Sequence, residues 1–203
     1  MLEACALIAG VLVAQLATLR GNIAAFDVRI AELVAAHPDR AIFASLPGAG
    51  AALVPRLIVA FGTRRDRYQD AYAMQCYSGI APVTKASGNS ESVHFRFACP
   101  KFLRQTFHEF AAHSITESEW AKAYYDHQRN DQKKEHHVAV RSLAFKWIRI
   151  IFRCWKDGKP YDEEKYMQSL RRRGSLLVDA LQPATNVGWK SVAGFQKLSE
   201  NNA

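Results

Sequence analysis

The stretch that decides the fold is LVAQLATLRGNIAAFDVRIAEL, residues 12–33. Its large apolar side chains recur at alternating intervals of four and three residues, which places them along one side of an α-helix. This spacing is typical of helices that pair with other helices, and it favours a coiled coil over a core helix of a monomeric bundle. We therefore predict that residues 1–37 form a coiled-coil linker helix that makes the chain a homo-oligomer. Its seam comprises Leu12, Leu16, Leu19, Ile23, Phe26, Ile30 and Leu33.

The residues that follow predict an all-α domain over residues 38–175. His37-Pro38-Asp39 breaks the first helix, and a short helix through Ala44 then leads into Pro47-Gly48-Ala49-Gly50 and the apolar helix 51–61. This order is that of a helix-hairpin-helix-like element, whose turn can present backbone N–H groups at Gly48 and Gly50 to a DNA phosphate. An ordinary helical turn packed in the core has the same pattern.

Further helices are predicted from capping residues and from apolar spacing. They span residues 66–77, the segment from Pro100 to Ser114, the segment after a capping box at Thr116–Glu119, and residues 133–156 and 162–170. Residues 83–92 are small and polar, which predicts a loop, and residues 93–97 alternate like a short extended piece. Residues 176–203 are predicted to be a disordered tail.

The charge of the chain is basic and unevenly distributed. The formal net charge is +8, and residues 1–50 contribute three basic and four acidic side chains, so the excess begins after the first segment. A sustained basic excess favours a polyanionic partner, although a soluble protein of high pI has the same composition. The candidate nucleic-acid contacts are Lys85, Arg96, Lys101, Arg104, Lys146 and Arg149.

Several functional classes are disfavoured. The four cysteines are scattered without a C-x-x-C pair, which disfavours a zinc finger and fits the reduced thiols of a cytoplasmic protein. His108 and His113 are five residues apart, about 140° around a helix, so they cannot chelate zinc together. The apolar N-terminal run lacks a basic flank and is broken at Gln15, so we expect neither a signal peptide nor a membrane anchor.

Ser87 is the candidate nucleophile, in the polar sequence Ser87-Gly88-Asn89-Ser90. A serine hydroxyl is weakly nucleophilic unless a base, a metal or a positive field assists it. Lys85, His94, Arg96 and Lys101 are near in sequence and can supply such a field to a phosphate. From the spacing alone, an ordinary turn serine is the simpler interpretation.

Three short blocks together resemble one protein family. They are Ser45-Leu46-Pro47-Gly48-Ala49-Gly50, Tyr77-Ser78-Gly79-Ile80-Ala81-Pro82 and Ser87-Gly88-Asn89-Ser90. They are similar to the C-terminal half of transposases of the insertion-sequence family one-ten and its one-eleven-eleven relatives. The blocks at residues 98–109 and 141–150 are similar to one subgroup of that family, so the resemblance covers about residues 20–175.

The resemblance implies a function in DNA recombination. Full-length members join a resolvase-like domain with four acidic metal ligands to a coiled-coil linker and to a C-terminal domain. The serine after the Gly-x-x-Pro loop, which falls on Ser87, forms a covalent link with DNA, and a noncoding RNA guides the choice of sites. This sequence carries no counterpart of the acidic domain. We therefore expect no cofactor in this chain, magnesium only with that other domain, and autonomous enzymatic activity only if it is supplied.

Two hypotheses follow. In the first, the chain is the cytoplasmic DNA-binding part of a transposase, with Ser87 as nucleophile, DNA and a guide RNA as partners and no membrane association. In the second, it is a non-catalytic helical DNA-binding or dimerisation module from a decayed element. An upstream reading frame with acidic ligands would favour the first hypothesis, and its absence would favour the second.

Overall fold

The computed structural model describes residues 2–175 and 177, which form a mostly helical protein with one small hairpin. The helices are α1 (Leu2–Ala35), α2 (Arg40–Ala44), α3 (Gly50–Phe61), α4 (Ala71–Tyr77), α5 (Lys101–Glu117), α6 (Glu119–Asp126), α7 (His136–Asp157) and α8 (Glu163–Arg172). A π-helical turn, η1 (His127–Asp131), continues α6, and strands β1 (Val83–Ser87) and β2 (Ser90–His94) pair antiparallel. The predicted all-α class is confirmed, with this hairpin as an addition.

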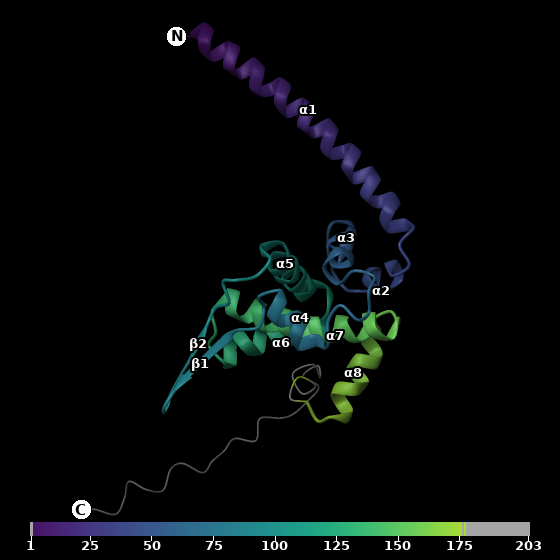
Figure 1. Ribbon diagram of the computed structural model, residues 1–203, viewed down its shortest axis with the longest axis vertical. Coiled ribbons are helices and arrows are strands. Elements are labelled where there is room, and N and C mark those ends of the chain that lie inside the picture. Colours follow the sequence, from purple (N-terminus) through teal and green to yellow (C-terminus); the bar gives the residue numbers. More distant parts are fainter. Residues whose placement is uncertain (1, 176, 178–203) are drawn as a thin grey trace, which may run out of the picture.

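Helix α7 is the centre of the folded body. It packs against α5, α4, α6 and α2 (Figure 1), and its apolar positions from Ala139 to Trp155 are buried at helical spacing. Each of three buried indoles has a hydrogen-bond partner: Trp147 donates to Ser114 Oγ at 2.7 Å, Trp120 to Tyr161 Oη at 2.8 Å and Trp155 to the Gly62 carbonyl at 2.9 Å. These bonds remove the cost of burying the indole N–H groups, so the aromatic core is well specified.

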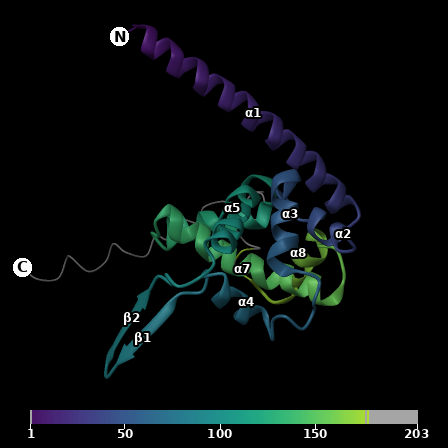
Figure 2. The ribbon, with the colours of Figure 1, turned by 45° about the horizontal axis from the view of Figure 1, so that its top comes forward.

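Helix α1 lies apart from this body. It extends away as a single long rod and meets the body only near its C-terminal end, where Val34 packs against the core (Figure 1, Figure 2). All seven seam residues are exposed, from Ile30 at 41% to Phe26 at 69%. A seam that is exposed in a single chain is an apolar surface that lacks a partner.

By length and composition alone, Glu3–Ala35 is also apolar enough to cross a membrane, and none of that window is buried. We expected no membrane anchor because the run lacks a basic flank and is broken at Gln15, and length and composition alone do not contradict that expectation. Among the described residues, no other helix meets the same criterion.

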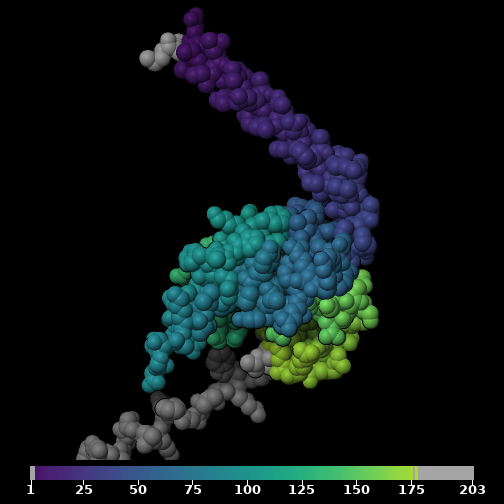
Figure 3. All heavy atoms as spheres, in the orientation of Figure 1, coloured from purple at the N-terminus to yellow at the C-terminus, as the bar shows by residue number. Residues whose placement is uncertain are grey.

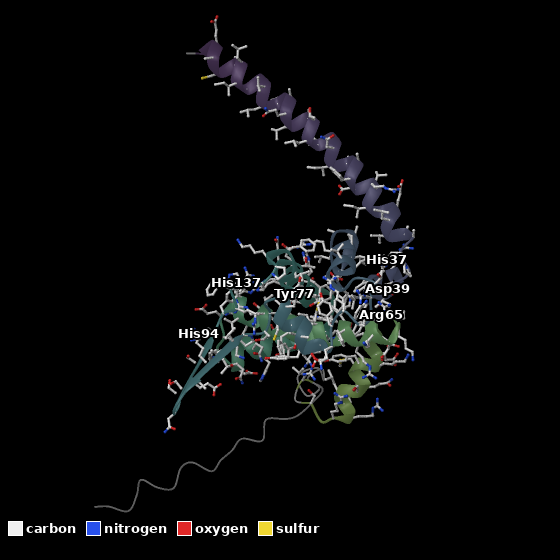
Figure 4. The ribbon with its side chains drawn as sticks, in the orientation of Figure 1. His37, Asp39, Arg65, Tyr77, His94 and His137 are labelled. Atoms are coloured by element: carbon white, nitrogen blue, oxygen red, sulfur yellow. The ribbon has the colours of Figure 1, made fainter. Side chains whose placement is uncertain are left out.

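The turn between α1 and α2 is fixed by a buried ion pair. Asp39 is 6% exposed, and its two carboxylate oxygens accept bonds from Arg65 at 2.8 and 2.5 Å. Arg65 also lies over the Trp155 ring, 4.8 Å from its centroid, and His37 Nδ1 accepts a bond from the Asp39 N–H. His37, Asp39 and Arg65 therefore gather where α1 joins the body (Figure 4).

Four local predictions are wrong. The helix predicted over residues 66–77 begins only at Ala71, because the Asp70 side chain caps it by accepting the Ala73 N–H. The capping box at residues 116–119 does not form, since Thr116 lies inside α5; Ser118 instead donates to Glu163. The predicted loop 83–92 is a hairpin, and the extended piece predicted at 93–97 begins earlier, as strand β2. The predicted disordered tail is not one of these four: apart from Leu177 it lies outside the described residues, and it stays a prediction.

Candidate nucleic-acid interface

The hairpin carries Ser87 at its tip, projecting from the body on the side away from α1 (Figure 2). Gly88 adopts φ +57° in the turn, a conformation that glycine adopts without strain. The space-filling view in Figure 3 shows the hairpin as a narrow protrusion. Ser87 is exposed and pairs across the turn with Ser90, so its hydroxyl is accessible to a large substrate.

One face of the hairpin is polar apart from Val83. Lys85 and Val83 lie two and four residues before Ser87 on β1, and their cross-strand partners are Ser92 and His94. Because alternate strand residues share a face and directly paired residues lie side by side, Ser87 and Lys85 share this face. Ser92 Oγ and His94 Nε2 are hydrogen-bonded at 2.9 Å on the same face. A cation, a serine and an imidazole thus line the path from the tip to the base of the hairpin.

The base of the hairpin is tied to helix α4. Arg96 donates from Nε to the Ala81 carbonyl at 3.3 Å and lies 3.7 Å from Cys76 Sγ. Gly79, at φ +75°, leaves no room for a side chain, because a Cβ there would lie 2.3 Å from Cys99 Sγ. Arg96, which we predicted as a nucleic-acid contact, is half-buried and also holds the base of the hairpin, so its role toward nucleic acid stays a prediction.

An aromatic and cationic cluster lies where the hairpin joins α5. The guanidinium carbons of Arg104 and Arg141 are 4.7 and 4.3 Å from the centroid of the Phe95 ring. Burial and the neighbouring Arg104 charge lower the pKa of Arg141 from its usual value. Phe95 and Arg141 were not among our candidates. The alternation of Val93, Phe95 and Phe97 in the sequence could have indicated the aromatic cluster. Arg141 lies on another helix, and no local sequence pattern indicates that it contacts Phe95.

The remaining candidate cations are divided between two places. Lys101 is exposed at the first turn of α5, close in sequence to Arg104. Lys146 instead lies between Trp120 and Tyr124, with its Nζ 5.6 and 4.6 Å from their ring centroids. Burial, followed by the Arg149 charge, lowers the pKa of Lys146. On α7, Lys146 is about 140° around the axis from Arg141, which shares the Phe95 ring with Arg104, so Lys146 lies apart from the Arg104 cluster.

The turn before α3 does not leave both of its glycines accessible to a phosphate. A Cβ at Gly48 would lie 3.0 Å from the His113 backbone, so this glycine faces helix α5. Gly50 is exposed and has nothing within 4 Å of such a Cβ. Of the two, only Gly50 is free of neighbours, and the helix-hairpin-helix assignment is not confirmed.

The residues that the structure describes contain no group of three or more His, Cys, Asp or Glu side chains that could hold a metal ion. The hairpin itself offers too few metal ligands. His94 is hydrogen-bonded to Ser92, and Glu91 lies on the opposite face from Ser87. Magnesium prefers several oxygen ligands. These residues therefore do not fit a catalytic metal.

Comparison with known proteins identifies the helical domain. A family model described as "Transposase IS116/IS110/IS902 family" matches residues 40–126, a range that includes the whole hairpin. The chain is 31% identical over 129 residues to "Mini-circle putative transposase for IS117" of Streptomyces coelicolor, covering 64% of this chain and 31% of that protein. It is 30% identical over 139 residues to "Insertion element IS110 uncharacterized 43.6 kDa protein" of the same organism, covering 68% and 34%. The chain thus spans about a third of the length of these curated relatives.

Proposed function

Because the chain belongs to the IS116/IS110/IS902 family of transposases, we propose that it is the DNA-binding part of a DNA-recombining enzyme and that Ser87 is the nucleophile. The observation that carries this proposal is the position of Ser87 inside the matched range, exposed at the tip of a hairpin. Lys85 shares its face and can hold a phosphate by charge.

The proposed chemistry is transesterification. The Ser87 Oγ forms a bond to the phosphorus of a DNA phosphodiester, while the bond between that phosphorus and one sugar oxygen breaks. The serine proton passes to a base, and the departing sugar oxygen takes up a proton and leaves as a hydroxyl. One phosphate ester replaces another, so a hydroxyl on a different strand can reverse the step and join that strand.

We propose that magnesium, which the family resemblance implies, is held by an acidic domain and not by the residues that the structure describes. The support is the lack of a suitable ligand cluster among the described residues. Catalysis then requires assembly of the two parts, and the long helix α1 is the element available to bring them together. A guide RNA would be a second nucleic-acid partner for the basic domain.

We further propose that α1 pairs with a second copy of the chain and that the protein is cytoplasmic. The uncharged part of α1 runs only from Ala4 to Leu19, about 24 Å of helix, whereas a hydrocarbon core is about 30 Å thick. From Arg20 onward, charged residues lie beside the seam, as they do in coiled coils.

The test is denaturing electrophoresis of labelled element-end DNA with the chain and the acidic domain of a full-length relative. We expect a protein–DNA adduct with the wild type and with Ser90→Ala, and none with Ser87→Ala. Ser90 is the matched control, because it faces Ser87 across the turn. An adduct that survives Ser87→Ala would move the nucleophile elsewhere. The chain without the acidic domain should form little adduct, and a full yield from it alone would contradict the need for a second domain.

A further inference from the structure

Phe97 is an unusually exposed aromatic residue directly after the hairpin. Its side chain is 82% exposed, more than any other large apolar side chain of the described residues. It is held in place by Phe95, whose ring packs edge-to-face against it with centroids 5.0 Å apart. Exposure of this much aromatic surface is unfavourable in water, and a ring supported from one side leaves the other side free for a planar partner.

Phe95, one ring of the aromatic pair, lies against two arginines that have no acidic partner among the described residues. Arg104 and Arg141 approach Phe95 from α5 and α7, and neither forms an ion pair with any carboxylate among the described residues. Within the described part of the chain, Arg104 donates only to the Arg96 carbonyl. Two neighbouring guanidinium groups repel each other, and an added anion would relieve that repulsion. A phosphate is the anion whose geometry guanidinium groups match.

A flat apolar ring beside a double positive charge is complementary to a nucleotide. We propose that Phe97, Arg104 and Arg141 hold one unpaired nucleotide of the DNA strand, with its base stacked on Phe97 and its phosphate at the arginines. The base must be unpaired, because in a duplex both of its faces are covered by neighbouring bases. This inference rests on the proposed function, since it takes DNA as the substrate.

The position of this site relative to Ser87 supports the assignment. Phe97 is seven residues beyond Ser90, the partner of Ser87, about 23 Å along an extended chain. A strand held at Ser87 therefore reaches Phe97 within several nucleotides. Strand exchange requires bases near the cut to leave their old partners, and a stacking ring would stabilise that unpaired state.

The test is a fluorescence titration of the full chain with three labelled DNAs: a single strand, a perfect duplex, and a duplex with one unpaired 2-aminopurine. We expect Phe97→Ala to weaken binding of the single strand and of the unpaired-base duplex by roughly 5- to 150-fold. It should leave the perfect duplex unchanged, and Phe97→Trp should retain binding. The 2-aminopurine fluorescence should be quenched by the wild type and not by Phe97→Ala.

Phe102→Ala is the matched control, because Phe102 is 44% exposed and its neighbouring Arg56 is neutralised by Glu109. This variant should bind all three DNAs like the wild type. Equal quenching by Phe97→Ala and wild type, or equal losses for the perfect duplex, would overturn the proposed site. Failure to bind any of the three DNAs would instead contradict the proposed function. Phe97-dependent binding of a single-stranded RNA with no binding of the DNA single strand would reassign the site to RNA and overturn the proposal for DNA.

Discussion

Asp39 is a buried carboxylate whose only charged partner among the described residues is Arg65. We expect Asp39→Ala to lower the free energy of unfolding by about 3 kcal/mol, because it leaves a partly buried guanidinium without its counter-charge. Urea denaturation monitored by circular dichroism measures the change. Asp66→Ala is the control: it breaks the exposed pair with Arg64 and should leave stability nearly unchanged. Equal losses in the two variants would show that the Asp39 pair does not stabilise the junction.

His108 makes stability depend on pH. Burial is the main cause that lowers the pKa of His108, and the charges of Arg141, His137 and His136 lower it further. The hydrogen bond with the His137 carbonyl acts in the opposite direction and raises this pKa. A histidine whose folded pKa lies below its unfolded value, about 6.5, binds fewer protons when folded. Its contribution is therefore complete above that pH and is lost as the pH falls toward the folded pKa.

We accordingly expect the urea concentration at the unfolding midpoint of the wild type to decrease when the pH is lowered from 7.5 to 5. We expect His108→Gln to make this decrease smaller. His113→Gln, an exposed position on the same helix, should keep the wild-type slope. A slope that His108→Gln leaves unaltered would assign the pH dependence to other groups.

At the scale of elements, α1 is the helix that we predict to pair with a second copy of the chain. Leu19→Asp with Phe26→Asp places two charges on the seam, and we expect the chain to become monomeric by multi-angle light scattering. Ala24→Asp with Ala31→Asp adds the same charge at exposed positions on the side of the helix away from the seam and should leave the oligomer intact. A wild-type mass equal to one chain would contradict pairing through α1.

The elements that sequence patterns predicted well are those with strong local signals. Helix α7 was predicted to within three residues at its start and one at its end, because its apolar spacing is regular and Gly158, at φ +66°, stops it. The hairpin was missed because its residues are exposed on both faces apart from Val83. Without a buried face there is no apolar alternation to detect, so the pairing shows only in three dimensions.

The candidate site was predicted in part for the same reason. Ser87 and Lys85 are close in sequence, and the strand register places them on one face. The structural bond of Arg96 was not predicted, because its acceptor, the Ala81 carbonyl, lies fifteen residues away. Arg141 was missed because it reaches Phe95 from a helix 46 residues later in the chain. Residue type alone does not distinguish a cation that holds the fold from one that is free to hold a ligand.

At the scale of the whole molecule, the positive charge resides in the body and not in α1. DNA binding should therefore weaken steeply with salt, with a slope of log K against log salt of about −4 if roughly four phosphates are contacted. Lys101→Gln should reduce the slope by about 1. Arg153→Gln, whose cation is paired with Asp157, should not change it. Fluorescence anisotropy between 50 and 300 mM salt measures both, and a flat salt response would exclude electrostatic binding.

The clamp of Asp39 by Arg65 makes α1 a lever arm. Its 34 residues span about 50 Å, and among the described residues its attachment to the body lies at one end. A rotation of about 10° at the His37–Asp39 joint would swing the far tip by about 9 Å, more than one helical turn. A partner bound at the tip of α1 would therefore exert a large torque on the folded body. A small repacking around Arg65 would change the orientation of the hairpin relative to that partner.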